Sequence, residues 1–179
     1  MDRQKNKYYY LKGIKNGMPI CLGYLAVSFT LGITARNAGM TAWQAMLTSL
    51  ACNASAGQYA GFTVIAAGGT YFEMVLMELV ANARYLLMSC SLSQKFSSET
   101  SLLHRLLVGF DVTDEIFGVA VSEPGKLNPF YNYGMMTVAI PGWSLGTFFG
   151  VIMGNILPAN IVSALSVGLY GMFLAIIIP

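Results

Sequence analysis

The strongest constraint on the fold is the length of three stretches that contain no Asp, Glu, Lys or Arg. They run from residue 16 to 35, from 37 to 72 and from 127 to 179. An α-helix crosses the hydrocarbon core of a bilayer with about 20 apolar residues, so each stretch is long enough for at least one span. The alternating segments of roughly 10 residues that build membrane β-barrels are absent. The sequence therefore predicts an all-α, polytopic membrane protein.

Composition supports this fold class. Hydrophobic residues make up 55% of the chain and charged residues 10%, and the mean hydropathy is +0.59. A soluble protein carries roughly 25% charged residues. A chain of 179 residues holds about six spans with short loops, so we expect a single membrane-embedded domain over residues 1–179. The net charge of +2 gives no reason to expect nucleic acid as a partner.

Six segments are expected to be helical: about 18–34, 41–68, 71–92, 105–121, 134–155 and 161–178. Basic residues and tyrosines before the first segment place the N-terminus in the cytoplasm by the positive-inside rule. The last segment ends in FLAIIIP without the polar residues that usually finish a span. We therefore expect the chain to be incomplete at this end.

The segment 41–68 is too long for one simple span. Its 28 residues would form a helix of about 42 Å, against a hydrocarbon core of roughly 30 Å. Its middle reads CNASAGQ, which is small and polar. The sequence predicts two half-helices, 41–52 and 58–68, because small residues allow neighbours to satisfy the freed backbone groups. A continuous helix with a small-residue packing face remains the alternative.

The basic residues give a mild preference for a segment 41–68 that dips into the membrane and returns. With Arg84 left aside, this arrangement gives seven Lys and Arg inside and two outside, against six and three for a single crossing. In both arrangements the segment 105–121 crosses once. Lys95 and Lys126 are therefore expected on opposite sides.

Polar residues within the predicted spans are the candidate functional residues, because ionisable groups in lipid cost about 2.5 to 3.5 kcal/mol each. The start of the second half-helix offers free amide groups and a positive dipole end for a carboxylate. The expected substrate-binding residues there and on the next segment are Asn53, Ser55, Gly57, Gln58 and Asn82.

A second group of candidate functional residues is charged and lies on the third and fourth segments. On the third segment Glu78, Asn82, Tyr85 and Ser89 form one polar stripe at helical spacing, with Arg84 beside it. If 105–121 is one helix, its three acids share a face and repel one another unless a cation compensates. The group expected to act in proton coupling or as an ion pair is Arg84, Asp111, Asp114 and Glu115. Both roles remain open.

Four glycines at strict four-residue spacing mark the fifth segment. They are Gly142, Gly146, Gly150 and Gly154. This spacing is typical of a helix face that allows another backbone to approach closely, so it predicts a packing seam. The alternative is a smooth wall along a substrate path.

Several segments resemble the AzlC family of branched-chain amino acid exporters in their order and spacing. They are GMPICLGYLAVSFTLG (17–32), AGQY (56–59), NARYLLMSCSL (82–92), TDEIF (113–117) and GWSLGTFFGVIMGN (142–155). The resemblance implies the large subunit of a bacterial inner-membrane exporter that is driven by the proton gradient and works with a small AzlD-like membrane subunit. It maps the family's polar positions onto Gln58, Asn82, Arg84, Thr113, Asp114 and Glu115. It also implies that the chain lacks the family's last one or two spans.

Other functions have weaker support in the sequence. An intramembrane hydrolase would need a base for Ser55, and the only histidine, His104, lies at a segment start beside a polar loop, so we expect no enzyme activity. The sequence also indicates no metal site and no cofactor. A membrane scaffold or assembly subunit that does not transport, and that uses the glycine seam to hold a partner, is the alternative to export.

Overall fold

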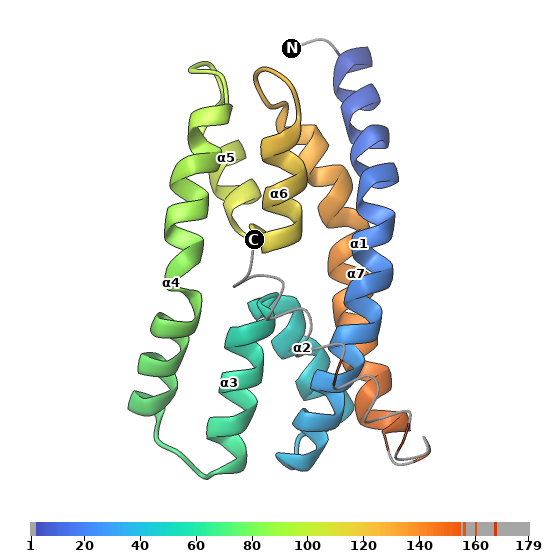
Figure 1. The fold of residues 1–179 in the computed structure, drawn as a ribbon, viewed down its shortest axis with the longest axis vertical. Helices are drawn as coiled ribbons and strands as arrows, with labels where there is room; N and C mark the ends of the chain where they lie inside the picture. Colours follow the sequence, from blue (N-terminus) through green and yellow to red (C-terminus); the bar gives the residue numbers. More distant parts are fainter. Residues whose placement is uncertain (1–2, 155, 157–159, 161–166, 168–179) are drawn as a thin grey trace. The chain divides into compact units, whose positions relative to one another are not determined.

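The fold is taken from a computed structural model that describes residues 3–154, 156, 160 and 167. Between residues 3 and 154 it has seven helices and no strand, which confirms the predicted all-α class. The helices are α1 (Arg3–Asn37), α2 (Ala42–Cys52), α3 (Ser55–Ala66), α4 (Tyr71–Lys95), α5 (Leu102–Gly109), α6 (Asp114–Ser122) and α7 (Pro129–Met153) (Figure 1). Among these helices, α1, α4 and α7 are long and apolar enough to cross a membrane.

The chain divides into two compact units. Unit 1 consists of Met1–Cys21 and Ala83–Ile140, and unit 2 of Leu22–Asn82 and Pro141–Pro179. Each unit contains part of α1, α4 and α7 together with one pair of short helices. In α1 and α7 the division falls within a few residues of a helix proline, Pro19 and Pro141. A proline inside a helix removes one backbone hydrogen bond and kinks the helix, so these are natural places for a division.

Two helices begin earlier than the sequence predicts. Helix α1 starts at Arg3 instead of residue 18, because the polar N-terminal segment continues the helix. Helix α7 starts at Pro129 instead of residue 134. The side chain of Asn128 caps it by accepting a hydrogen bond of 3.0 Å from the Phe130 amide, and Pro129 suits the first helical position. The predicted segment 161–178 lies almost wholly outside the described residues.

In unit 2 the predicted interruption of 41–68 is present. Helix α2 begins with a capping box between Thr41 and Gln44 and ends at Asn53, whose backbone is left-handed with φ 44° and ψ 36°. Asn tolerates this conformation better than most residues. The second half-helix starts at Ser55 instead of residue 58, so the break is narrower than predicted.

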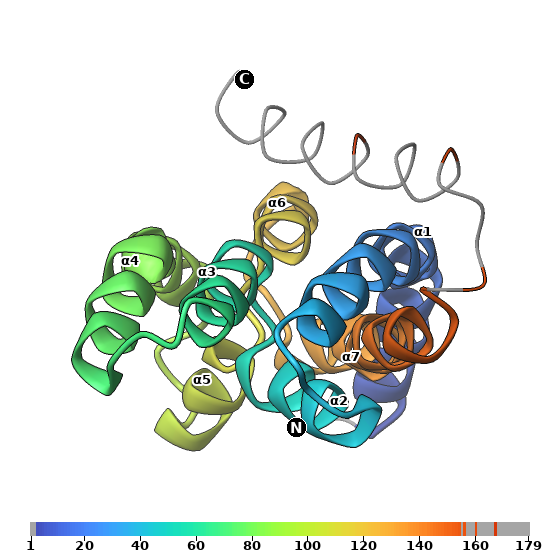
Figure 2. The same ribbon diagram turned by 90° about the horizontal axis from the view of Figure 1, so that it is seen from below.

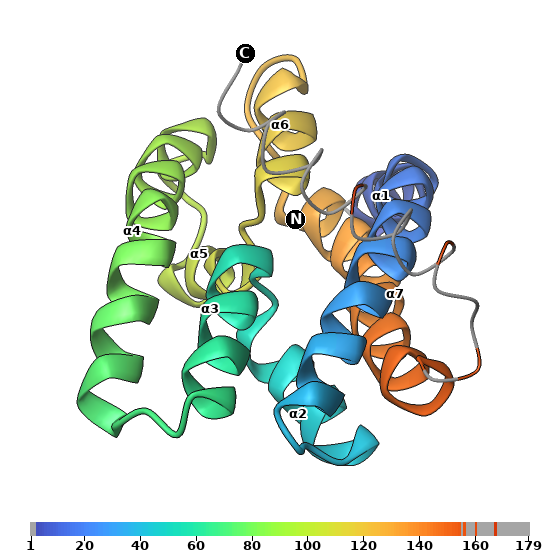
Figure 3. The same ribbon diagram turned by 60° about the horizontal axis from the view of Figure 1, so that its bottom comes forward.

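The two half-helices fold back on one another at this break (Figures 1 and 3). The Gln58 side chain on α3 donates a hydrogen bond of 2.5 Å to Ser49 on α2. Nine residues of a straight helix would separate these positions by about 13 Å. The contact therefore requires a hairpin of half-helices, and the continuous-helix alternative is wrong.

Unit 1 contains a second interruption that the sequence analysis did not predict. The segment expected as one helix over 105–121 is divided into α5 and α6, which Figures 1 and 2 show as two separate helices. Helix α5 ends with its cap at Phe110, and Thr113 caps the start of α6 by accepting a hydrogen bond from the Ile116 amide. The expectation of one continuous helix over 105–121 is therefore wrong.

The second hairpin also changes the placement of the loops. Lys126 Nζ donates a hydrogen bond of 3.1 Å to the Gln94 carbonyl, and the Leu127 amide donates one of 2.9 Å to the Lys95 carbonyl. The loops before α5 and after α6 thus lie together at one end of unit 1. The expectation that Lys95 and Lys126 lie on opposite sides is wrong, because α5 and α6 enter and leave at the same end.

Close contact between α1 and α7 is common to both units (Figures 1 and 2). In unit 1, Gly13 and Gly134 face one another, and a Cβ on either would collide with backbone of the other helix. In unit 2, a Cβ on Gly150 would collide with the Phe29 backbone, and one on Gly146 with Leu25 and Ser28. The packing-seam interpretation holds for the glycines at 146 and 150, whose partner is α1 of the same chain.

Candidate functional site

The start of α3 in unit 2 presents backbone groups without partners inside the helix. Its N-cap residue, Ala54, has no side-chain hydrogen bond to the first turn. The first intrahelical bond of the turn is the one of 2.8 Å from the Gln58 amide to the Ala54 carbonyl. The amides of the three preceding residues, 55–57, have no acceptor within the helix. Together with the helix dipole they favour an anion at this end.

A chain of buried polar side chains fixes this helix start. Trp143 Nε1 donates a hydrogen bond of 2.8 Å to Gln58 Oε1, and Gln58 Nε2 donates to Ser49 Oγ at 2.5 Å. Ser49 Oγ and Thr147 Oγ1 are 2.7 Å apart. All four side chains are buried. They connect α2, α3 and α7, so Gln58 has both ends of its amide engaged and holds the break in place.

Helix α4 lies against the opposite part of the same turn. A Cβ on Gly57 would come within 2.6 Å of both Glu78 Oε2 and Asn82 Nδ2. Asn82 Nδ2 donates a hydrogen bond of 2.7 Å to Glu78 Oε2, while Asn82 Oδ1 is buried without a hydrogen-bond partner. A side chain at position 57 would displace the ends of the Glu78 and Asn82 side chains, so Gly57 allows these polar groups to lie against the first turn of α3.

Glu78 is a site residue that sequence reasoning did not select. It belongs to the predicted polar stripe, but nothing in the sequence shows that α3 passes it. The structure places its carboxylate along Gly57 and Gly61 of α3. No salt bridge of Glu78 occurs among the residues the structure describes. A half-buried carboxylate beside an unpaired amide oxygen is an arrangement of acceptors suited to a cation.

Of the other predicted substrate-binding residues, Asn53 forms the buried turn between the half-helices and Ser55 is the first residue of α3. Ser55, Gly57 and Gln58 therefore lie in the first turn of α3, and Asn53 lies in the break just before it. Asn82 joins them from α4.

The predicted charged group lies in unit 1. Arg84 Nη2 and Asp114 Oδ2 are 2.9 Å apart, and the two side chains are 30% and 22% exposed. The Arg84 guanidinium also lies 5.1 Å from the centre of the Tyr85 ring. This pair joins α4 to the first turn of α6, where the helix dipole also favours Asp114 and Glu115.

Asp111 does not share a helix face with the other two acids, and this part of the expectation is wrong. It lies in the break before α6, and the N-cap residue Thr113 separates it from that helix. Asp111 is almost completely buried, with 1% of its surface exposed. The two breaks thus resemble one another: each places a buried polar residue, Asn53 or Asp111, just before the start of a half-helix.

Together, the long apolar helices and the two hairpins of half-helices with buried polar residues define a polytopic α-helical membrane protein of transporter-like organisation. Comparison with known proteins gives the family. A family model described as AzlC protein matches residues 19–157. The chain belongs to the AzlC family.

Relatives agree with this assignment. The chain is 30% identical over 172 residues to an uncharacterised membrane protein of Archaeoglobus fulgidus, a match that covers 95% of this chain and 75% of the relative. It is 25% identical over 150 residues to the inner membrane protein YgaZ of Escherichia coli K12, covering 82% of this chain and 61% of YgaZ. A membrane protein of Helicobacter pylori is 25% identical over 153 residues, covering 82% of this chain and 66% of the relative. No solved structure matches the chain.

Proposed function

We propose that this chain is part of a secondary transporter that exports branched-chain amino acids. The observation that carries the proposal is the uncapped start of α3, held by the buried Gln58 chain and faced by Glu78 and Asn82. Membership of the AzlC family and similarity to membrane proteins support a transporter-like role. The substrate and the direction of transport are the parts that we propose.

An amino acid is a zwitterion, so its binding site away from water needs an anion-binding group close to a cation-binding group. In unit 2 the amides of residues 55–57 would bind the α-carboxylate. Glu78 and the free Asn82 Oδ1 lie against Gly57 and would bind the ammonium group. Both groups meet at one glycine, which suits the short distance between the two charges of an α-amino acid.

Proton coupling is the second part of the proposal, and the acids of unit 1 are its candidates. Asp111 is buried in the α5–α6 break, and Asp114 is paired with Arg84. A carboxylate in such a place can take up a proton when its cation partner moves away. Glu115 is the third acid of this group.

We further propose that the protein lies in the cytoplasmic (inner) membrane of a bacterium, with its N-terminus in the cytoplasm and a small AzlD-like subunit as partner. The orientation is supported by the charges. Nine of the ten Lys and Arg residues belong to unit 1, and only Arg36 belongs to unit 2. The positive-inside rule then places the end of unit 1 that carries the loops in the cytoplasm.

Transport of labelled leucine into energised everted vesicles, with the full-length protein and its small subunit present, tests the proposal. We expect Glu78→Gln to reduce transport at least tenfold, because the ammonium would lose its charged partner. Gln58→Ala should also reduce it, by loosening the start of α3. Glu73→Gln is the matched control: it is an exposed acid on the same helix, five residues away, and should transport normally.

Asp114→Asn separates the two parts of the proposal. If leucine exchange across the membrane persists while accumulation against a gradient is lost, the residue acts in coupling. Unchanged transport in Glu78→Gln, Gln58→Ala and Asp114→Asn together would overturn the proposed export function.

The alternative function, a membrane scaffold that does not transport, depended on a free glycine seam that could hold a partner. Its partner-binding surface was the glycine seam of α7, and in unit 2 that seam is filled by α1 at Gly146 and Gly150. We therefore propose export in preference to a scaffold without transport, and in preference to an enzyme.

A further inference from the structure

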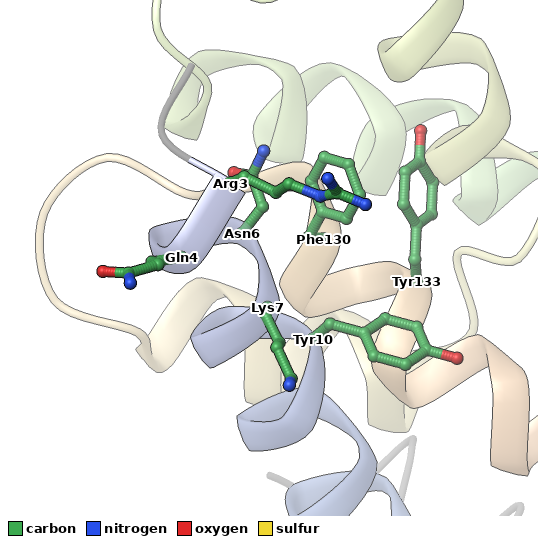
Figure 4. A pocket seen from close by; sticks show the side chains of 7 residues that line it. All are labelled: Arg3, Gln4, Asn6, Lys7, Tyr10, Phe130 and Tyr133. Atoms are coloured by element: carbon green, nitrogen blue, oxygen red, sulfur yellow. The ribbon is translucent and has the colours of Figure 1, made fainter.

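Unit 1 contains a cavity that the proposed export function does not use. It lies between the first turns of α1 and the start of α7 and has a volume of about 840 Å³ (Figure 4). Its walls include Arg3, Lys7 and Tyr10 from α1, and Phe130 and Tyr133 from α7. This volume lies within the range of roughly 300 to 1,000 Å³ that is typical of small-molecule sites.

The cavity is cationic. Arg3 and Lys7 are one helical turn apart on α1, and both are exposed. Neither forms a salt bridge among the described residues, whereas Lys12 on the same helix is paired with Glu123 at 2.6 Å. Among the described residues, no acidic side chain lines the cavity. Two unpaired cations in one cavity favour an anionic ligand.

Its aromatic walls are held by contacts with one another and with residues outside the cavity. The rings of Phe130 and Tyr133 meet edge to face at 5.5 Å. Tyr133 Oη lies 2.8 Å from Nδ1 of His104 on α5, and Tyr10 Oη lies 3.0 Å from Thr137 Oγ1 on α7. These contacts fix the walls in place, so the cavity is a formed site. Aromatic residues near the end of a spanning helix are typical of the membrane interface.

We propose that this cavity binds the headgroup of an anionic phospholipid. The phosphate would lie between Arg3 and Lys7, since guanidinium groups bind phosphate oxygens in pairs and ammonium groups act as point charges. The glycerol portion would lie over Tyr10, Phe130 and Tyr133. Two observations favour a lipid: the chain has helices long and apolar enough to span a membrane, and the charge of the cavity is complementary to an anionic headgroup. Basic pockets between spanning helices at the cytoplasmic side bind anionic headgroups in general, and the position of this cavity at that side rests on the orientation proposed above.

Binding of phosphatidylglycerol to the purified full-length protein tests the inference. The protein is placed in phosphatidylcholine nanodiscs, and thermal unfolding is followed as phosphatidylglycerol replaces part of the lipid. We expect a rise in the midpoint temperature that saturates. Each basic residue near an anionic surface contributes about fivefold in affinity, so Arg3→Gln with Lys7→Gln should weaken apparent binding by about 25-fold. The double variant Lys5→Gln with Lys15→Gln is the charge-matched control, because both lysines are exposed on the same helix and neither lines the cavity.

The outcomes are distinct. Loss of the shift in the variant of Arg3 and Lys7 but not in the variant of Lys5 and Lys15 supports the proposed site. An equal loss in both would show general attraction to a charged surface and overturn it, as would the absence of any shift with the native sequence. A shift of the same size with soluble glycerol 3-phosphate would overturn the lipid assignment in favour of a small phosphate ester.

Discussion

At the residue scale, single side chains determine where the helices of this protein stop. Asn53 adopts the left-handed backbone that turns α2 into α3, and Thr113 caps α6 after the second break. Gln58 uses both ends of its amide to connect α3 to α2 and α7. The candidate site therefore depends on a few polar residues that shape the backbone as much as on those that would contact a ligand.

The left-handed backbone at Asn53 leads to a prediction. Asn53→Gly should change the free energy of unfolding by only a few tenths of a kcal/mol. Asn53→Ala should lower it by about 1 kcal/mol more than Asn53→Gly does, because Ala resists positive φ. Both variants remove the same amide, so their difference isolates the backbone. Unfolding by sodium dodecyl sulfate in mixed micelles measures it. Equal stability of the two variants would contradict a left-handed residue at this position.

At the scale of elements, two kinds of contact hold the helices together. Glycines bring α1 and α7 into backbone contact in each unit, and polar side chains connect the half-helices to their neighbours. Lipid tails are as apolar as leucine, so helices in a membrane gain little from hydrophobic burial and depend on such close packing. We therefore expect small substitutions at the glycine contacts and at the polar contacts to lower stability.

Gly150→Ala tests the close packing. The added methyl group would collide with the Phe29 backbone, so we expect a loss of about 1 to 3 kcal/mol in the free energy of unfolding. Gly23→Ala is the control, because a Cβ there meets nothing within 4 Å. That change should be neutral or stabilising by up to about 1 kcal/mol through helix propensity. Equal effects at both positions would argue against the seam.

The ion pair between α4 and α6 is tested by a double-mutant cycle with Arg84→Gln and Asp114→Asn. Both side chains are partly exposed, so we expect a coupling free energy of only about 1 kcal/mol. The double variant should therefore lose less stability than the two single variants lose together. Thermal unfolding of the four proteins gives the coupling. A value of zero would mean that the pair does not hold the two helices together.

At the scale of the whole molecule, the arrangement of loops in unit 1 determines how the chain meets the membrane. Lys5 of α1, Ser97 of the α4–α5 loop and Lys126 of the α6–α7 loop line one small cavity of about 240 Å³. The N-terminal segment and both loops thus lie at one end of unit 1. Most of the basic residues of the chain are near this end, which agrees with the positive-inside rule.

Cysteine labelling in intact cells tests this topology. In a variant whose three native cysteines are replaced, Ser98→Cys should be protected from a membrane-impermeant maleimide added outside, and should react after the cytoplasmic side is opened. Asn37→Cys, at the end of α1, is expected to react from outside and serves as the positive control. Reaction of both cysteines from outside would contradict a return of the chain through the α2–α3 hairpin. Reaction of Ser98→Cys alone from outside would contradict the proposed orientation.

Much of this fold could be predicted because membranes impose simple rules. Uncharged runs longer than a span indicated a helical membrane protein, and the overlong segment 41–68 indicated a break. The second break was missed because α5 and α6 together have 17 residues, about the length of one span. The TDE sequence after Val112 was the available signal, since Thr at an N-cap followed by acids marks a helix start.

The sequence by itself determined the class of this protein and the few places along the chain where polar residues occur within apolar segments, because polar groups in lipid are costly. Its ordered motifs also indicated the family. Only the tertiary structure decided which of these residues meet. Glu78 reaches Gly57, and Gln58 reaches Trp143, because a hairpin turns α3 back between α2 and α4. Spacing along a chain indicates neighbours within one helix, but contacts between helices depend on how the backbone folds in three dimensions.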